Sequence, residues 1–479
     1  MGSLFPGGSG LTASDYAVFV VLLSGMTALG WRVGERTTTA AEFFDAGGRL
    51  PWFAAAAALV SAEVSALTVI GVPAIAFRGD WMFLQLFLGA AAGRLLVAYL
   101  FVPAFFRGRG DTIYAYLGRR FGPLTQAAAA ASFVASRLLI AGVRLLAASV
   151  AAGALLGWAP GPTLALFTIV ALVALVRGGA PAAVWAGAFQ TAVILVVGGL
   201  AAAYLLHRAD GGLPAAWSVA VAGGKLHAWE WRPLPLAFVT GFVGSAAAFG
   251  TDHELAQKLL VVNGPREGRT ALLVSTAGSL LVLLAYLTIG TLLFVFYKQN
   301  PGMALPDRLD RIFPHFAATA MPRVLRGLVL SAVVMASIDA PLASLSAAFV
   351  ADLRRPFARA AGPGEELLAA RRCAAVFALI LAALAAVFMV SETSMSLAFK
   401  AGGVTSGPLL GAFLLGLTTE RRGDVPVVAA LVGIAALNLA LLALSQRGLL
   451  TMDWGWLVAL GALGTYGLAY AFTRPASTR

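Results

Sequence analysis

The sequence predicts an all-α integral membrane protein of about thirteen transmembrane helices, and two observations carry this prediction. Of its 479 residues, 60% are hydrophobic and 12% are charged, with a mean hydropathy of +0.86. That is more apolar surface than one globular core can bury. Apolar stretches of roughly 18 to 27 residues recur along the chain, and at ~1.5 Å per residue each can cross a ~30 Å hydrocarbon core. We therefore expect the chain to lie in lipid.

The apolar stretches predict thirteen spans, whose boundaries are accurate to several residues. In chain order they cover residues 13–31, 51–77, 81–106, 123–156, 161–177, 180–206, 235–262, 268–297, 324–350, 368–391, 395–417, 425–446 and 452–473. The segments 207–234 and 298–323 between spans are long enough for interfacial or lid helices, but not for a separate domain. We expect one domain over residues 1–479.

The basic residues indicate how the chain is oriented. Alternating the spans places roughly 20 Lys and Arg on one side of the membrane and roughly 10 on the other, and the richer side is expected to be cytoplasmic. This predicts an outside N-terminus and a cytoplasmic C-terminus, in a bacterial-type inner membrane. The loops on the basic side contain Arg107, Arg109, Arg119, Arg120, Arg354, Arg355, Arg359, Arg371, Arg372, Arg421 and Arg422.

Several function classes are not expected. The formal net charge of +12 requires no nucleic-acid partner, because no basic run has interleaved aromatic residues. Cys373 is the only cysteine, so neither an intrachain disulfide nor a cysteine-based metal site can form. The sequence contains no HExxH, catalytic carboxylate pair or nucleophile motif, and an enzyme is therefore not expected. Residues 1–14 carry no Lys or Arg, so the first span is expected to be an anchor rather than a cleaved signal peptide.

Two spans carry polar interruptions. Residues 61–66, Ser-Ala-Glu-Val-Ser-Ala, place hydroxyls and a carboxylate at mid-membrane depth in the second span. Five spans later, the glycine-rich residues 241–246 lead to Gly250-Thr251-Asp252. Interrupted helices at matching positions indicate an inverted-repeat transporter whose site lies at the membrane midplane.

Six stretches, taken in order, resemble motifs of the sodium:solute symporter family, which includes proline, sialic acid, pantothenate and sodium/glucose transporters. They are residues 43–50 (FFDAGGRL), 65–73 (SALTVIGVP), 111–122 (DT through RRFG), 250–258 (GTDHELAQK), the serine-rich 337–352 and 408–416 (PLLG through G). The resemblance covers most of residues 13–420. It implies the LeuT-type fold of two inverted five-helix repeats, 51–206 and 235–417, with one extra helix before them (13–31) and two after (425–473).

The resemblance implies a secondary active transporter that couples a cation, Na⁺ or H⁺, to symport of a small organic solute by alternating access. The expected partners are this solute and the lipid bilayer; the oligomeric state stays open, and a monomer is plausible. The alternative is a non-coupled or degenerate symporter homologue that acts as a membrane sensor. Only residues 473–479 follow the last span, which favours the transporter.

By similarity to the shared sodium site of the family, the carbonyls of Ser61 and Val64 are expected to face the carbonyl of Val333 and the hydroxyl of Ser337. Geometry favours this reading, because an unwound helix offers carbonyl oxygens that a regular helix would use internally. Ala336 stands where the family usually has a second hydroxyl, which leaves both Na⁺ and H⁺ open as the coupling ion.

Two carboxylates, Glu63 and Asp339, fall at mid-membrane depth, where an ionisable group is costly unless it is paired or hydrated. Either could complete a cation site or exchange a proton. Glu63 could instead cap the broken helix, and Asp339 could pair with an intramembrane arginine. Gly187 stands where some members carry the aspartate of a further sodium site, so that site is not expected.

Four basic residues fall inside spans. Arg94 is expected to snorkel toward the cytoplasmic side. Arg137 and Arg144 are seven residues apart on one helix face, where a guanidinium can bind a carboxylate with two hydrogen bonds; sialic acid symporters use an arginine on this helix, and Arg137 resembles it. With Lys400, these residues favour a carboxylate-bearing anion or zwitterion as the solute, unless they pair internally with Glu63 and Asp339. Thr68 and Gln190 are expected to face the same cavity, although Gln190 also fits a role in helix packing.

Overall fold

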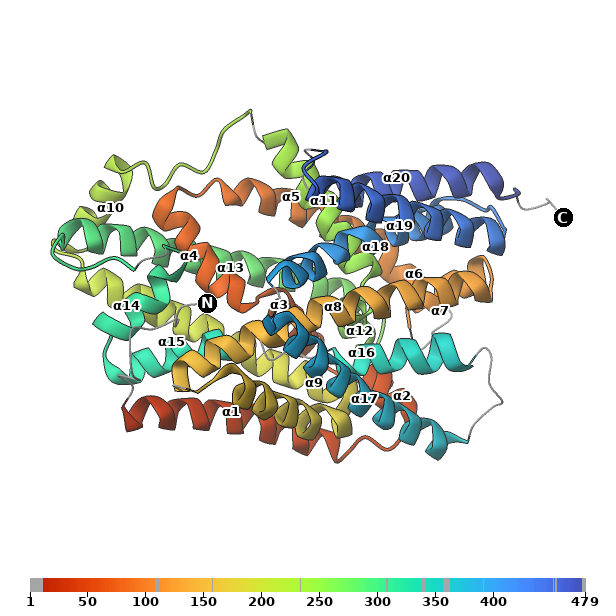
Figure 1. Ribbon diagram of the computed structural model, residues 1–479, viewed down its shortest axis with the longest axis horizontal. Coiled ribbons are helices and arrows are strands. Elements are labelled where there is room, and N and C mark those ends of the chain that lie inside the picture. Colours follow the sequence, from red (N-terminus) through yellow and green to blue (C-terminus); the bar gives the residue numbers. More distant parts are fainter. Residues whose placement is uncertain are drawn as a thin grey trace.

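The protein is a bundle whose long helices run mostly along one direction, from left to right in Figure 1. The computed structural model describes residues 12–475, apart from 108–111, 157, 233, 307–308, 337–340, 356–361, 391, 451 and 453–454. Within this part of the chain, the secondary structure consists of helices and one isolated antiparallel bridge between Arg422 and Arg474. The predicted all-α class is confirmed.

The long helices lie within or close to the predicted spans, several of which contain more than one helix. They are α1 (Ala13–Gly34), α3 (Trp52–Glu63), α4 (Ala66–Arg78), α5 (Phe83–Leu96), α8 (Pro123–Leu156), α9 (Pro160–Arg208), α11 (Leu234–Thr251), α13 (Pro265–Gln299), α15 (Arg323–Met335), α17 (Pro363–Val390), α18 (Glu392–Thr418), α19 (Asp424–Gln446) and α20 (Gly455–Phe472). Short elements join them: α2 (Ala40–Asp45), η1 (Ala46–Gly48), η2 (Val97–Phe101), α6 (Val102–Phe106), α7 (Tyr114–Arg120), α10 (Gly212–Ala222), α12 (His253–Leu260), η3 (Leu309–Arg311), α14 (Ile312–Ala320), α16 (Leu342–Ala347) and η4 (Ala348–Arg354).

Among the described residues, nine helices are long and apolar enough to cross a membrane, or ten if α3 and α4 count as one bent span. The chain is therefore a multi-pass membrane protein, but the count of about thirteen is not confirmed. The prediction of one continuous span over 324–350 is wrong, because α15 ends at Met335 and α16 begins only after Pro341. Pro341 has no backbone N–H to donate to a preceding turn, which favours the start of a helix over its interior. The predicted spans 161–177 and 180–206 meet at Gly179 (φ 56°, ψ −141°), whose non-helical backbone divides α9 into two helices at a kink.

Both predicted polar interruptions are present. Val64 (φ −77°, ψ 111°) and Ser65 (φ −108°, ψ 173°) are extended, and the helices on either side of them are bent by 62°. Asp252 (φ −84°, ψ 116°) separates α11 from α12, and its Oδ1 accepts a 2.8 Å hydrogen bond from the Glu254 N–H. An aspartate in this position caps the helix that follows. The division into two five-helix repeats stays a prediction.

The segments predicted to hold lid helices contain α10 and α14, toward the left end of Figure 1. After α10, the buried Lys225 reaches the end of α4: its Nζ donates to the carbonyls of Phe77 (2.8 Å), Arg78 (3.1 Å) and Gly79 (3.0 Å). A cation on the last carbonyls of a helix also complements the helix dipole. The second half of the broken helix, α4, is thus fastened to this loop.

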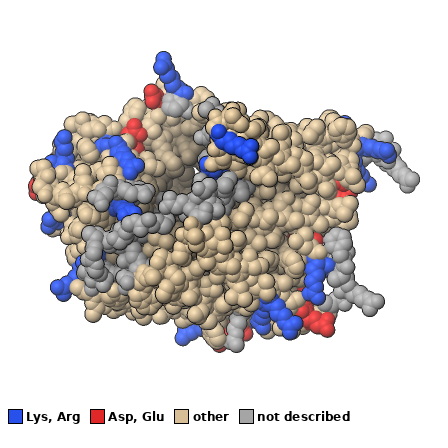
Figure 2. Space-filling model, in the orientation of Figure 1, with Lys and Arg blue, Asp and Glu red and all other residues tan. Residues whose placement is uncertain are grey.

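Figure 2 shows a broad area without charged side chains across the middle of one face, with most Lys and Arg toward its edges. This distribution fits a belt of lipid contact. The basic α7, the end of η4, the start of α17 and the α18–α19 turn gather toward the right end of Figure 1. Hydrogen bonds join two of these segments: the guanidinium of Arg120, on α7, donates to the Gly416 and Arg421 carbonyls at the α18–α19 turn, at 3.2 and 2.9 Å.

Candidate ion and substrate site

The break between α3 and α4 releases the two carbonyls that were predicted as ion ligands. In a continuous helix, the Ser61 carbonyl would accept from the Ser65 N–H, and the Val64 carbonyl from the Thr68 N–H. Here the Ser65 N–H donates to Thr68 Oγ1 (3.4 Å), and the Thr68 N–H donates to the Ser65 carbonyl (2.9 Å). Thr68, predicted to touch the solute, therefore also helps to hold the break open.

One segment of α9 packs against both α3 and the end of α15. A Cβ atom on Gly187 would lie 2.5 Å from Ser61 Oγ, so α9 and α3 are in close contact there. Four residues on, Thr191 Oγ1 donates a 2.7 Å hydrogen bond to the Ala57 carbonyl of α3. Between them, Gln190 Nε2 donates a 2.9 Å hydrogen bond to the Met335 carbonyl, at the last residue of α15. The same stretch thus positions two helix C-termini.

Val333 lies in the last turn of α15, is 5% exposed and belongs to the same buried apolar cluster as Val64. Its carbonyl would accept from the N–H of Ser337 if α15 continued. Ser337 and Asp339, the two other predicted cation ligands on this segment, lie outside the described residues.

Glu63, at the last residue of α3, forms an ion pair with Arg94 of α5 and accepts a 2.5 Å hydrogen bond from Ser279 Oγ of α13. Arg94 is 1% exposed, donates from Nε to Ser245 Oγ (3.3 Å) and stacks its guanidinium on the ring of Phe249 (4.6 Å). The expectation that Arg94 snorkels is therefore wrong, because the Glu63 carboxylate gives this buried cation a partner. The sequence also allowed an internal ion pair for Glu63, but with Arg137, Arg144 or Lys400 as its partner.

The two arginines of α8 have different surroundings. Arg144 Nη2 donates a 2.9 Å hydrogen bond to the Ala62 carbonyl, so Arg144 lies at the break. Arg137 is two turns nearer the start of α8, and its guanidinium forms ion pairs with Asp252 (3.0 Å) and Glu254 at the break between α11 and α12. Of the two predicted substrate contacts, only Arg144 adjoins the interrupted part of α3.

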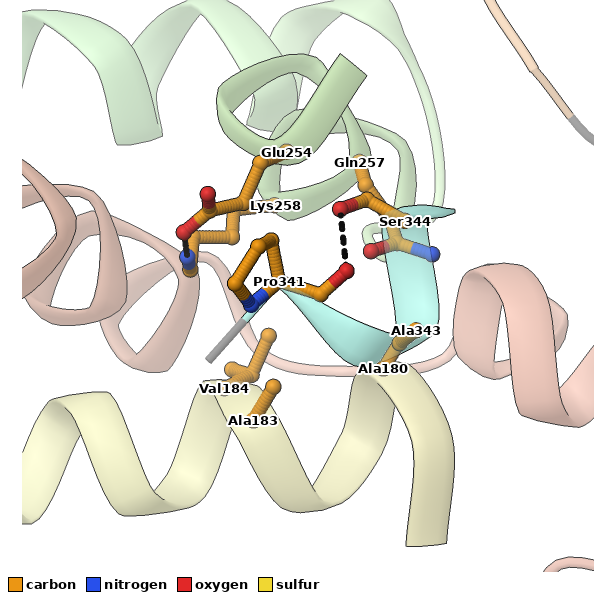
Figure 3. Close-up of a pocket in the computed structure, with 9 residues that line it drawn as sticks. All are labelled: Ala180, Ala183, Val184, Glu254, Gln257, Lys258, Pro341, Ala343 and Ser344. Carbon is orange, nitrogen blue, oxygen red and sulfur yellow. Dashed lines mark hydrogen bonds and ion pairs between the residues drawn. The ribbon is translucent and has the colours of Figure 1, made fainter. Parts of the chain in front are cut away.

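The charges around Arg137 extend into α12, because Glu254 also pairs with Lys258 at 3.1 Å, and both side chains are at most 5% exposed. Beside this pair lies a small cavity between α9, α12 and the start of α16 (Figure 3). In Figure 3, Glu254 and Lys258 lie above the centre of the view, Pro341 lies at the centre, and Ala183 and Val184 lie below it. Its volume is about 10 Å³, which is room for about one water molecule. The helices are closely packed here.

Lys400 lies on α18 and is half-buried. The residues not anticipated from the sequence are the partners: Arg94 and Ser279 for Glu63, and Asp252 and Glu254 for Arg137. The motif at residues 250–258 was noted, and Arg94 was recognised as an intramembrane arginine, but no sequence pattern pairs residues on separate helices.

Comparisons with known proteins agree with this architecture. The sialic acid symporter SiaT of Proteus mirabilis, described as a sodium/sialic acid symporter, is 26% identical over 446 residues, which cover 90% of this chain and 89% of that protein. The human sodium/iodide cotransporter is 27% identical over 454 residues, covering 89% of this chain and 69% of that protein. A solved structure of a Na⁺-coupled sialic acid symporter, in a substrate-bound outward-open state, superposes with a TM-score of 0.86 at 21% identity, over 97% of this chain and 99% of that chain.

The family model described as "Sodium:solute symporter family" matches residues 43–425. The match confirms the predictions of a membrane transporter rather than an enzyme, and of cation-coupled symport of a small solute. On this match, together with the relatives and the shared fold, the chain belongs to the sodium:solute symporter family.

Proposed function

We propose that the protein uses a Na⁺ gradient to transport a small carboxylate-bearing solute, by alternating access to the two ends of the bundle. The observation that carries the proposal is the α3–α4 break. There the N–H groups of Ser65 and Thr68, which would bond to the Ser61 and Val64 carbonyls in a continuous helix, donate to other acceptors. Carbonyl oxygens are ligands that hard cations favour, and the C-termini of α3 and α15 add partial negative charge. Val333 and, by similarity, Ser337 complete the ligand set on the opposite side.

Sodium is favoured over a proton by the pairing of Glu63. Its carboxylate already has the Arg94 guanidinium as a counter-charge, and an ionised group inside the membrane is tolerated when it is paired. Glu63, the residue before Val64, then helps to position the carbonyl ligands of the ion site. Asp339 is the second candidate carboxylate. The relatives described above are named for sodium, which supports the same ion here.

We assign the solute carboxylate to Arg144, because its guanidinium lies at the break beside the proposed ion site. A guanidinium and a carboxylate can form two parallel charge-assisted hydrogen bonds. Sialic acid and iodide, for which two relatives are named, are both anions. Thr68 and Lys400 are proposed as further polar contacts of the solute, while Gln190 holds the end of α15.

Arg137 has a different proposed role. Its contacts with Asp252 and Glu254 join α8 to the α11–α12 break. They therefore hold the helices together on the path toward the basic end, which is the end of the bundle where α7 and the α18–α19 turn lie. Opening that path requires these ion pairs to separate, as alternating access demands. The basic end is proposed to be cytoplasmic, with the N-terminus outside and the C-terminus inside a bacterial-type inner membrane.

Uptake by proteoliposomes tests the proposal. Purified full-length protein is reconstituted, and uptake of labelled N-acetylneuraminate, pyruvate and, as a neutral control, glucose is measured under an inward Na⁺ gradient or an inward H⁺ gradient. We expect the Na⁺ gradient to drive uptake of a carboxylate but not of glucose, and Arg144→Gln to reduce that uptake.

Uptake driven by the H⁺ gradient alone would overturn the assignment of sodium. Glucose uptake equal to that of the carboxylates would overturn the assignment of the solute class. If neither gradient drives any of the three solutes while the protein retains a single sharp thermal transition, the proposed symport of this solute class is wrong.

A further inference from the structure

A second, much larger cavity lies at the end of the bundle where α6, α7 and the α18–α19 turn meet, toward the right in Figure 1. Its volume is about 800 Å³, and residues from the segments 99–107, 116–122 and 416–422 line it. No described residue of the candidate ion and substrate site is among them. Arg94, the nearest such group along α5, is thirteen residues from Arg107, or ~20 Å along a helix.

The lining of this cavity is strongly basic. Arg107, Arg119, Arg120 and Arg422 contribute to it, against one carboxylate, Glu420. All four guanidiniums stay charged at any physiological pH. A cavity with these walls attracts an anion, and the planar guanidinium matches the geometry of phosphate oxygens.

The walls are fixed by the protein itself. Arg120 donates to the carbonyls of Gly416 (3.2 Å), Arg421 (2.9 Å) and Thr419, which fastens α7 to the end of α18. Arg119 Nη2 donates to the Arg107 carbonyl (3.0 Å). A site whose walls are already in place pays less conformational entropy when a ligand binds. Arg120 is largely occupied by the turn, which leaves Arg107, Arg119 and Arg422 as the principal groups for a ligand.

The cavity borders the lipid-facing surface. Tyr99 lines it from η2 and is 60% exposed, and the Arg269 guanidinium lies 5.3 Å from the centre of the Tyr99 ring. On the α20 side, the Arg421 guanidinium lies 3.8 Å from the Tyr470 ring centre. Exposed tyrosines with arginines beside them are typical of the level of the lipid headgroups.

From this combination we propose that the cavity binds the phosphate group of an anionic phospholipid from the leaflet at the basic end. Arg107, Arg119 and Arg422 contact the phosphate, and Tyr99 and Leu100 contact the lipid's glycerol and upper acyl chain. Basic pockets between membrane helices are suited to anionic headgroups, and the volume is in the range of ligand sites. A soluble phosphate ester shares the headgroup chemistry, but the exposed Tyr99 ring with Arg269 beside it favours the lipid.

Thermal unfolding of the detergent-purified full chain tests the proposal, with dioctanoyl phosphatidylglycerol, dioctanoyl phosphatidylcholine or glycerol 3-phosphate as the titrated probe. A ligand that binds only the folded state raises the unfolding temperature. We expect phosphatidylglycerol to raise it, and the other two probes to have little effect. The double variant Arg107→Gln/Arg119→Gln should weaken the apparent affinity for phosphatidylglycerol at least tenfold, because each lost charge-assisted hydrogen bond contributes substantially to the binding free energy. Arg447→Gln, an exposed arginine in the α19–α20 turn, is the matched control and should leave the affinity unchanged.

Glu420→Gln keeps the test decisive if the double variant does not fold. Glu420 is exposed, and removing its charge should tighten phosphatidylglycerol binding about two- to fivefold. Equal stabilisation by phosphatidylcholine, or an unchanged affinity in Glu420→Gln, would overturn the anionic site. Stabilisation by glycerol 3-phosphate at the same concentrations would overturn the lipid as its source.

Discussion

Arg144 Nη2 donates a 2.9 Å hydrogen bond to the carbonyl oxygen of Ala62, one residue before the end of α3. This contact links the scaffold helix α8 to the point where α3 stops. It also places a permanent positive charge beside the carbonyls of Ser61 and Val64, which we propose as sodium ligands. A solute carboxylate bound to Arg144 would lie between the Arg144 guanidinium and the bound Na⁺. The solute and Na⁺ would then each strengthen the binding of the other.

The first prediction concerns Arg144. In Arg144→Lys the charge remains but the planar fork is lost, and Lys is a poor replacement at a two-bond contact. We expect the KM for the solute to rise about 10- to 100-fold, equivalent to about 1.5–3 kcal/mol for hydrogen bonds to a charged group. Na⁺-driven uptake into proteoliposomes measures this, with Arg447→Lys as the control. An unchanged KM would remove Arg144 from the substrate site.

The second prediction concerns Glu63 and Arg94. Removing one member of a buried ion pair leaves the other charge uncompensated, at a cost of about 3–5 kcal/mol. The Arg94 side chain is 1% exposed but that of Glu63 is 34% exposed, so water can hydrate an unpaired Glu63 far better. Glu63→Gln should therefore lower the unfolding temperature more than Arg94→Gln does.

The double variant Glu63→Gln/Arg94→Gln separates this account from simple loss of packing. It removes both charges together, so we expect it to unfold at a higher temperature than Glu63→Gln alone. If the two single losses add up in the double variant, the residues are not coupled and the ion pair does not stabilise the bundle.

The Glu63–Arg94 pair also shows where the sequence stops being informative. A carboxylate in the middle of an apolar span is visible at once, and so is an arginine in another span. Their pairing depends on how α3, α5 and α13 pack, and a lone arginine can equally well snorkel to the headgroups. The sequence alone does not show which distant helices pack together, so Arg94 was not predicted as the partner of Glu63.

The helices themselves were more predictable, because length and apolarity alone decide whether a segment can cross a membrane. The breaks at Val64 and Asp252 were found through polar residues in apolar surroundings. The break after Met335 was missed, although the polar Ser337 and Asp339 and the nearby Pro341 were usable signals. Arg137 and Arg144 share one helix face, and only the position of α3 distinguishes them.

The third prediction concerns Lys225, whose ammonium caps the three last carbonyls of α4. Lys225→Met keeps most of the side-chain volume but leaves these carbonyls without the charged donor. We expect a loss of about 1.5–3 kcal/mol in the free energy of unfolding, seen as a lower unfolding temperature. Lys298→Met, an exposed lysine in the last turn of α13, should have no such effect. Equal effects of the two substitutions would argue against the cap.

The fourth prediction concerns the ion pairs of Arg137 with Asp252 and Glu254, which we propose hold the path to the basic end closed. Arg137→Gln removes both pairs and should favour conformations that are open at that end.

Ala183→Cys, in the lining of the small cavity of Figure 3, reports this opening in a Cys373→Ala background, where it is the sole thiol. Maleimide labelling of inside-out vesicles should become about tenfold faster, which corresponds to about 1.4 kcal/mol of bias between the two states. Arg32→Gln, an exposed arginine in the last turn of α1, should leave the rate unchanged. Both the solute and Na⁺ can leave at this end only when it opens. Faster maleimide labelling with Arg137→Gln but not with Arg32→Gln would therefore identify these ion pairs as the contacts that keep the end closed. An equal rate in all three proteins would show that Arg137 serves only to hold α12 in place.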